Sequence, residues 1–230
     1  MLLALDTATD ITSIALASEG ELVAELTWHA GKNHTVELIP NLLHLLCQAR
    51  ATTKDISAIA VAKGPGSFNG LRVGMSTAKG LAYSLGVPLV GVSTLEVEAF
   101  PHRTTPLPIC PILNAGRGEV ATALFQMRRG RWCRLVAEHI TTVDLLGGET
   151  GARTLFCGEV SPELASQLRR HLGRQAVIIE GAALRRRAGY LAELGWRKLR
   201  AGEQDNPATL QPLYLRKPAI TKPRAQKEAG

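Results

Sequence analysis

Residues 64–74, with the sequence GPGSFNGLRVG, connect two segments of different pattern. The preceding run, 56–62, is short and apolar, which is typical of a buried strand, and residues 71–85 repeat Ala, Gly and Leu at helical spacing. Glycines at 64, 66 and 70 indicate positive φ or the close approach of another backbone. The stretch therefore predicts a buried strand, a tight turn and a helix, with Ser67 or Asn69 as the helix N-cap.

A glycine-rich turn before a helix also raises the hypothesis of a phosphate site, because backbone N–H groups at a helix start attract anions. The spacing departs from both usual motifs. No lysine follows these glycines at the offset of a P-loop, and Asn69 stands where the dinucleotide motif requires a glycine. A structural strand-to-helix turn is therefore the favoured interpretation of this loop.

The loop resembles the GPGSFTGLRVG signature of the bacterial TsaB family, the small partner in the synthesis of threonylcarbamoyladenosine (t6A) in tRNA. Asn69 replaces the threonine that is usual there. Four other segments match in register: residues 3–10 (LALDTATD), His34 with Glu37 and Leu38, residues 92–96 (VSTLE) and residues 212–216 (PLYLR). The resemblance is dense over residues 1–100 and thin beyond. The signature residues that it assigns are Gly64, Pro65, Gly66, Ser67, Phe68, Gly70 and Arg72.

The resemblance implies an α/β fold of the actin/hexokinase-like (ASKHA) type, with two related subdomains of mixed sheets, the second reduced. We expect the subdomains at residues 1–102 and 103–216, separated at a Pro-rich linker, and a disordered basic tail at residues 217–230. In ATPases of this fold the first hairpin faces a phosphate, which makes Asp6 and Thr7 candidate nucleotide contacts. The alternative, that Asp6 and Thr9 satisfy backbone groups of the turn, is left open.

Two predicted helices, at residues 34–49 and 70–85, carry more apolar surface than one face of a sheet needs. One alternative buries both helices inside a single core, and the other exposes part of their apolar surface as an interface. In the resembling family these helices meet their equivalents in a partner as a helical bundle, which favours the interface. The residues expected there are Leu38, Leu42, Leu45, Leu71, Met75 and Ala78.

The sequence shows no motif for catalysis or metal binding. Its four cysteines lie scattered in apolar runs without a Cys-x-x-Cys pair, so we expect buried free thiols rather than zinc ligands. The His-x-x-x-His pair of the family's catalytic relatives is absent, and residues 65–69 do not form a Gly-x-Ser-x-Gly motif. We expect no catalytic residue and no metal ligand. Asn114 stands where the family usually has an Asp, which leaves the role of that loop open.

The net charge of +7 is unevenly distributed, because residues 1–180 are balanced and residues 181–230 carry the whole excess. A basic section of this kind fits either contact with RNA phosphates or a solvated surface. The N-terminus lacks the basic segment of a signal peptide, and no stretch has the apolar length of a membrane span. A cytoplasmic protein is expected.

By resemblance, the chain is expected to be a non-catalytic subunit that binds a larger TsaD-like catalytic subunit and supports threonylcarbamoyl transfer to adenosine in tRNA. A TsaE-like ATPase and tRNA would join the assembled complex, ATP or ADP would bind only there, and the chain alone would form a homodimer. Two alternatives stay open: an ATP-hydrolysing enzyme acting through Asp6 and Thr7, and a basic RNA-binding module at residues 181–230.

Overall fold

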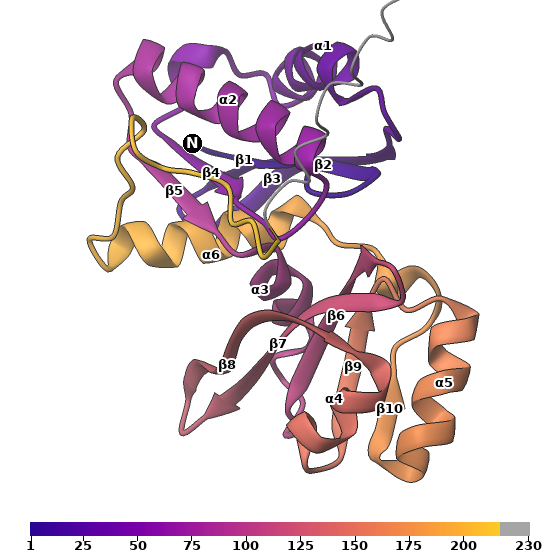
Figure 1. The fold of residues 1–230 in the computed structure, drawn as a ribbon. Coiled ribbons are helices and arrows are strands. Elements are labelled where there is room, and N and C mark those ends of the chain that lie inside the picture. The colour runs from indigo at the N-terminus through magenta and orange to yellow at the C-terminus, as the bar shows by residue number, and fades with distance from the viewer. Residues whose placement is uncertain (217–230) are drawn as a thin grey trace, which may run out of the picture.

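The computed structural model describes residues 1–216 and shows two five-stranded sheets, each with helices packed on its faces (Figure 1). The predicted tail at residues 217–230 lies outside the described residues. Helices on both faces are what an α/β fold requires to cover apolar sheet surfaces. Within residues 1–216, no helix is both long enough and apolar enough to span a bilayer.

The first sheet has the strand order β3-β2-β1-β4-β5. Its first three strands form an antiparallel meander, whereas β4 pairs in parallel with both β1 and β5. Parallel neighbours need crossover connections, and the helices that follow β3 and β4 supply them. The strands are β1 (Leu2–Asp6), β2 (Ile11–Ser18), β3 (Glu21–His29), β4 (Ala58–Ala62) and β5 (Leu89–Val92).

The second sheet repeats this topology in the order β10-β9-β6-β7-β8. Again three antiparallel strands come first and two parallel strands follow. The repetition confirms the predicted ASKHA-type architecture of two related subdomains, and the three-residue β10 shows the reduction of the second. The strands are β6 (Ile109–Gly116), β7 (Glu119–Arg128), β8 (Arg131–Thr142), β9 (Thr154–Gly158) and β10 (Ala176–Ile178).

Alternation along the strands gives the first sheet one face of large side chains and one of small side chains. Leu3, Leu5 and Ile59 belong to the large-residue face, which α1 (His34–Gln48) and α2 (Phe68–Leu85) cover. Ala4, Ala15 and Ala60 belong to the small-residue face.

The small-residue face receives α6 (Ala188–Arg200), a helix from the far end of the chain. A Cβ atom at Gly195 would lie only 2.6 Å from the Cβ of Ala60, so the helix backbone comes very close to the sheet. Figure 1 shows α6 under the first sheet, on the face opposite α1 and α2. The predicted extent of the second subdomain, 103–216, therefore needs correction, because α6 packs on the first sheet.

The six side chains predicted at a partner interface lie instead in the core of the first subdomain, and that assignment is wrong. Each is at most 4% exposed and packs between its helix and the large-residue face of the sheet or the turn beside it. The leucine-rich stripe of α1 packs on the sheet because the apolar face of the sheet lets it bury a large area. The corrected residues are Leu38, Leu42, Leu45, Leu71, Met75 and Ala78.

The short α3 (Thr94–Ala99) links the two halves, with Leu95 and Ala99 in the core of the second sheet. The other face of that sheet is covered by α4 (Val143–Thr150) and α5 (Pro162–Leu172). Ser161 caps the start of α5, whereas the sequence pattern does not predict α4, because its Gly147-Gly148 pair is unfavourable in a helix. Residues 1–216 also contain four 3-10 turns: Thr53–Asp55, Phe100–His102, Gly173–Gln175 and Gly181–Leu184.

Candidate functional site

The glycine-rich signature loop lies directly against the turn between β1 and β2. A Cβ atom at Gly66 would lie 2.2 Å from the carbonyl oxygen of Ala8, and one at Gly70 would lie 2.1 Å from that of Thr7. At Gly74 the Thr7 hydroxyl would lie 2.2 Å away. Their φ angles are not positive, so these glycines are needed for space rather than for conformational freedom.

Hydrogen bonds fix the same contact. The Ser67 N–H donates to the Ala8 carbonyl at 2.7 Å, and the Thr7 hydroxyl donates to the Gly70 carbonyl at 2.7 Å. Ser67 is also the N-cap of α2, because its hydroxyl accepts from the Gly70 N–H. Of the two predicted caps, Ser67 rather than Asn69 takes this role.

The C-terminal segment packs on the other side of the loop. Gly64 has a φ of +108°, and a Cβ there would lie 2.8 Å from the carbonyl oxygen of Leu213. The Leu213 N–H donates to the Lys63 carbonyl at 2.6 Å. The rings of Phe68 and Tyr214 lie 5.2 Å apart between centroids. The PLYLR segment therefore holds the signature loop from outside.

The remaining two matched segments meet the same loop. The Thr94 N–H donates to the Gly64 carbonyl at 2.9 Å, and the Thr94 hydroxyl accepts from the Gly64 N–H at 3.1 Å. His34 is buried, its Nδ1 lies 2.8 Å from the Thr12 hydroxyl, and burial lowers its pKa. A Cβ at Gly70 would lie 3.4 Å from His34 Nε2. All five segments that carry the resemblance thus converge at one place.

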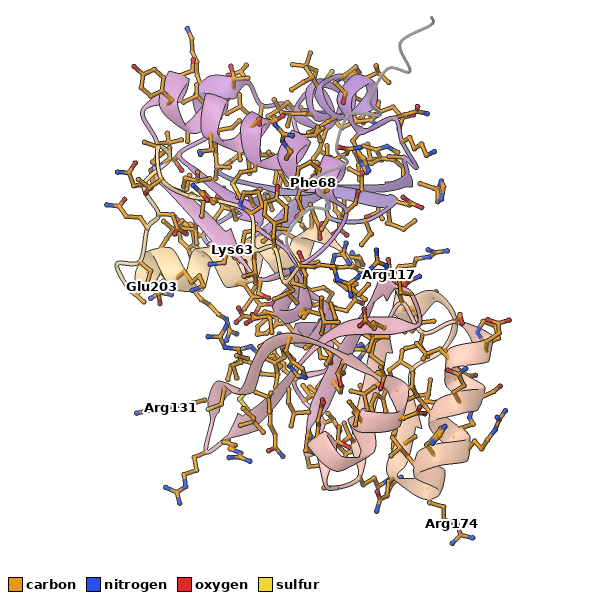
Figure 2. All side chains as sticks on the ribbon, viewed as in Figure 1. Lys63, Phe68, Arg117, Arg131, Arg174 and Glu203 are labelled. Atoms are coloured by element: carbon orange, nitrogen blue, oxygen red, sulfur yellow. The ribbon has the colours of Figure 1, made fainter. Side chains whose placement is uncertain are left out.

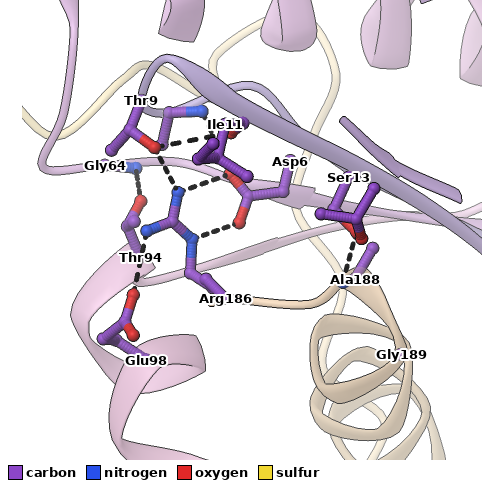
Figure 3. A network of polar contacts seen from close by, with 12 residues as sticks. Asp6, Thr9, Ile11, Ser13, Gly64, Thr94, Glu98, Arg186, Ala188 and Gly189 are labelled. Atoms are coloured by element: carbon purple, nitrogen blue, oxygen red, sulfur yellow. Dashed lines mark hydrogen bonds and ion pairs between the residues drawn. The ribbon is translucent and has the colours of Figure 1, made fainter. Parts of the chain in front are cut away.

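Beneath the turn lies a buried ion network centred on Arg186 (Figure 3). Its Nε donates to Asp6 Oδ2 at 2.5 Å, and a terminal nitrogen donates to Glu98 Oε2 at 3.0 Å. The other terminal nitrogen donates to the Thr9 hydroxyl at 3.1 Å, while Asp6 Oδ1 accepts from the Ala8 N–H at 3.0 Å. The three charged side chains are at most 5% exposed. The network ties the approach to α6, the β1–β2 turn and α3 together.

One arginine between two carboxylates leaves the network with an excess of negative charge if both are ionised. Burial raises the pKa of Glu98 to about 7, although the adjacent Arg186 works in the opposite direction. Burial alone would lower the pKa of Arg186, but Asp6 and Glu98 together outweigh this effect and raise that pKa above its ordinary value, so the guanidinium stays charged. Near neutral pH the protonated form of Glu98 relieves the excess charge.

The predicted nucleotide contacts at Asp6 and Thr7 are engaged in the fold. The Asp6 carboxylate forms an ion pair with Arg186, and the Thr7 hydroxyl donates a hydrogen bond to the Gly70 carbonyl. Thr7 and Ala8 also lie directly against the signature loop. A phosphate at this turn would have to displace a buried guanidinium from a carboxylate, which is costly. The residues present therefore do not fit a nucleotide phosphate here, and of the two interpretations the structural one describes Asp6.

A cleft between the two subdomains opens beside the signature loop. Two adjoining cavities, of about 440 and 510 Å³, share Thr9, Asp10, Asn114 and Glu159 in their walls. The Asn114 N–H donates to Glu159 at 2.8 Å, and its side-chain oxygen accepts from the Gly116 N–H at 2.8 Å. The Asp that is usual in the family at this position also has a side-chain oxygen, so it could accept the same hydrogen bond from the Gly116 N–H.

The outer face of α1 and α2, away from the sheet, exposes large apolar side chains. Val36, Ile39 and Leu43 on α1 are 69%, 43% and 55% exposed, and Tyr83 near the end of α2 is 88% exposed. Spacings of three and four residues place the three α1 side chains on one stripe. We call these four residues the α1–α2 surface.

Neither the buried network nor the signature loop forms a metal centre. Among residues 1–216, no group of three or more His, Cys, Asp or Glu side chains lies close enough to hold a metal ion. The sequence prediction missed Arg186 and Glu98. The only signal was the run of three arginines at 185–187, which does not reveal which of them is buried.

Comparison with known proteins identifies the relatives of the chain. A family model described as TsaD, tRNA N6-adenosine threonylcarbamoyltransferase, matches residues 28–223. The tRNA threonylcarbamoyladenosine biosynthesis protein TsaB of Bacillus subtilis is 35% identical over 94% of this chain and 93% of its own length. The protein of the same name from Escherichia coli is 34% identical over 57% of this chain and 58% of its own.

Solved structures share the fold. YeaZ from Pseudomonas aeruginosa has a TM-score of 0.78 at 24% identity and covers 93% of this chain and 99% of its own. Component A of an Acidaminococcus fermentans 2-hydroxyglutaryl-CoA dehydratase has a TM-score of 0.51 at 12% identity over 86% of this chain and 98% of its own. Through the family model and the full-length relative, the chain belongs to the TsaB family of tRNA threonylcarbamoyladenosine biosynthesis proteins.

Proposed function

We propose that this chain acts in t6A biosynthesis as a non-catalytic subunit, and that it binds a TsaD-like catalytic subunit through the α1–α2 surface. The observation that carries the proposal is the exposed apolar stripe of Val36, Ile39 and Leu43 on a helix whose opposite side is already fully packed. Within residues 1–216 the stripe is no part of the hydrophobic core, so it is available for a partner.

The energetics favour helix-on-helix association. Burying apolar side chains contributes roughly 25 cal/mol per Å² of surface removed from water, and part of this gain is offset by the cost of association. Small residues along the outer side of α2, including Ser76, Thr77 and Gly80, would let a partner helix approach closely. A bundle of four helices, two from each subunit, fits this surface.

The non-catalytic role is supported by the buried network. Thr7 and Ala8 of the turn that would face a phosphate lie against the signature loop, and the Asp6 carboxylate pairs with Arg186. Ser67, the serine of the loop, caps α2. Chemistry would then belong to the partner, with tRNA, a TsaE-like ATPase and ATP or ADP joining only the assembled cytoplasmic complex. Without its partner, the chain would pair with a second copy through the same surface.

Reconstitution of t6A formation tests the proposal. A TsaD homologue, the remaining components and an unmodified tRNA are combined with the chain, and modified nucleoside is measured. Wild-type chain is expected to restore modification, whereas Leu43→Glu is expected to reduce it at least tenfold because a charge would be buried in the interface. Leu145→Glu is the matched control, since Leu145 is 60% exposed on α4, far from α1. Equal loss in both variants would contradict the assigned surface.

The enzyme alternative has its own assay. ATP turnover by the isolated chain that disappears in Asp6→Ala would overturn the non-catalytic role. We expect no turnover by either protein, because the Asp6 carboxylate is held by Arg186 and is only 1% exposed.

A further inference from the structure

The end of the β7–β8 hairpin concentrates positive charge. Residues 126–134 contain four arginines and no acidic residue. Arg134 pairs with Glu138, but Arg128, Arg129 and Arg131 have no carboxylate within ion-pair distance among residues 1–216. All three are exposed, and Figure 2 shows Arg131 pointing away from the body of the molecule. We call these three residues the hairpin tip.

The hairpin tip is unfavourable for the fold. Arg129 has a φ of 48° and Gly130 a φ of 73°, so the two-residue turn needs positive φ at both positions. Asn, Asp or Gly is preferred at the first of these, whereas a long side chain is strained there. Arg128 also lies directly opposite Arg131 at the last rung of the hairpin, and like charges facing each other destabilise a strand pair. Local choices that oppose folding are expected at functional positions.

The hairpin is held firmly just behind its tip. Trp132, the residue after the tip, stacks on Phe125 with centroids 5.5 Å apart and planes 2° apart, and it meets Phe100 edge-on. These aromatic contacts join the hairpin to the core of the second sheet and to the end of α3. Three charges are therefore presented on a fixed arm.

We propose that the hairpin tip binds the phosphate backbone of tRNA, an inference that rests on the proposed function in tRNA modification. Arginine pairs with phosphate through two parallel hydrogen bonds, and three clustered guanidinium groups suit consecutive phosphates. The tip carries no exposed aromatic side chain for stacking on bases, so it would sense backbone charge rather than sequence. The tip lies far from the α1–α2 surface in Figure 1, so both can be occupied together.

The test compares two triple variants with the same change of charge. Arg128, Arg129 and Arg131 are replaced by Gln in one, and the exposed Arg153, Arg170 and Arg174 in the other. Arg174 lies at the opposite end of the second subdomain from Arg131 in Figure 2. Binding of a fluorescently labelled tRNA transcript is followed by anisotropy between 50 and 200 mM KCl, for the free chain and for its complex with a TsaD homologue.

The hairpin variant is expected to bind at least tenfold more weakly at about 0.1 M salt, and the slope of log affinity against log salt should become shallower by about two to three. The control should stay within about twofold of wild type. Equal losses in both variants, or no loss in the hairpin variant, would overturn the proposal. Unchanged tRNA binding together with weaker assembly would indicate an acidic protein surface instead.

Arg129→Asn separates binding from folding. Asparagine suits the positive φ of the turn, so the variant should melt at the same or a higher temperature while binding tRNA roughly threefold to tenfold more weakly. Unweakened binding would count against the tip. Light scattering on the same samples reports assembly independently: failure of wild type to assemble contradicts the proposed function, and the free-chain titration still decides the role of the hairpin.

Discussion

At three positions of the signature loop, Gly66, Gly70 and Gly74, only glycine fits because backbone or side-chain atoms of the neighbouring turn lie so close. Each leaves no room for a Cβ, because the Thr7–Ala8 turn lies within 2.1 to 2.2 Å of the position it would occupy. A motif that resembles an anion-binding loop therefore allows the start of α2 to pack closely against the turn between β1 and β2.

Gly70→Ala is expected to destabilise the chain by about 3 kcal/mol or more, because the Thr7 carbonyl would have to move. Gly80→Ala in the same helix is the control. A Cβ there meets nothing within 4 Å, so the better helix former should stabilise by about 0.5 to 1 kcal/mol. Urea unfolding measures both changes. Similar, small effects of the two substitutions would show that the turn and the loop are not in close contact.

The ionisation of Glu98 should appear in the pH dependence of stability. Its folded-state pKa, about 7, lies above the usual value of 4.5, so the folded state holds this proton more tightly. The contribution is fully present below about pH 4.5 and is lost as the pH rises toward 7, by roughly 2 to 3 kcal/mol.

Glu98→Gln should remove that dependence, so the stability of wild type relative to the variant should fall between pH 5 and pH 7. Urea unfolding at pH 5, 6, 7 and 8 measures the difference. The exposed Glu203→Gln is the control and should track wild type. A constant difference between wild type and Glu98→Gln across this range would mean that Glu98 does not titrate there.

Sequence patterns locate the site but not its internal chemistry. The five matched segments are visible in the sequence, yet the partner of Asp6 lies 180 residues away in a run of three arginines. Arg185 and Arg187 are exposed and Arg186 is buried, and only the path of the chain into α6 decides this. No local propensity distinguishes the three.

At the scale of elements, the helices predicted at residues 34–49 and 70–85 are present as α1 and α2, but the predicted outer face of α1 is wrong. Its sequence carries two apolar stripes, of which the one with Leu38, Leu42 and Leu45 packs on the sheet and the one with Val36, Ile39 and Leu43 stays outside. Periodicity fixes the angle between such stripes, but the shape of the opposing sheet decides which is buried. The packing of α6 on the first sheet was likewise beyond local patterns, because it joins segments far apart in the chain.

The attachment of α6 depends on polar contacts at its start. The Ala188 N–H donates to the Ser13 hydroxyl at 2.8 Å and the Gly189 N–H to Glu25 at 2.6 Å, so strands β2 and β3 satisfy the first backbone donors of the helix. Arg186, just before the helix, adds the buried ion network.

Arg186→Met is expected to destabilise the chain by about 3 to 5 kcal/mol, because Asp6 would remain buried without a counter-charge. Arg185→Met, at the exposed neighbouring position, should change stability by no more than about 0.5 kcal/mol. Denaturant unfolding followed by circular dichroism compares them. A mild effect at Arg186 would indicate that the network contributes little to holding α6.

At the scale of the whole molecule, two subdomains of the same topology differ in their edge strands and in the surfaces that they expose. The first is complete and exposes an apolar surface on α1 and α2, while the second carries a short edge strand and a basic hairpin. A cleft opens between them, where Thr9 and Asp10 of the β1–β2 turn line its wall, while Thr7 and Ala8 of the same turn lie against the signature loop and Asp6 pairs with Arg186. The arrangement fits a protein that acts by binding other macromolecules.

Multi-angle light scattering of the chain, alone and mixed with a TsaD homologue, tests this view most directly. The chain alone should have the mass of a homodimer, and the mixture should have the mass of a one-to-one heterodimer. Leu43→Glu should leave a folded monomer in both samples, while Leu145→Glu should behave as wild type. A wild-type chain that stays monomeric and unassociated in the mixture would contradict the role as a partner subunit.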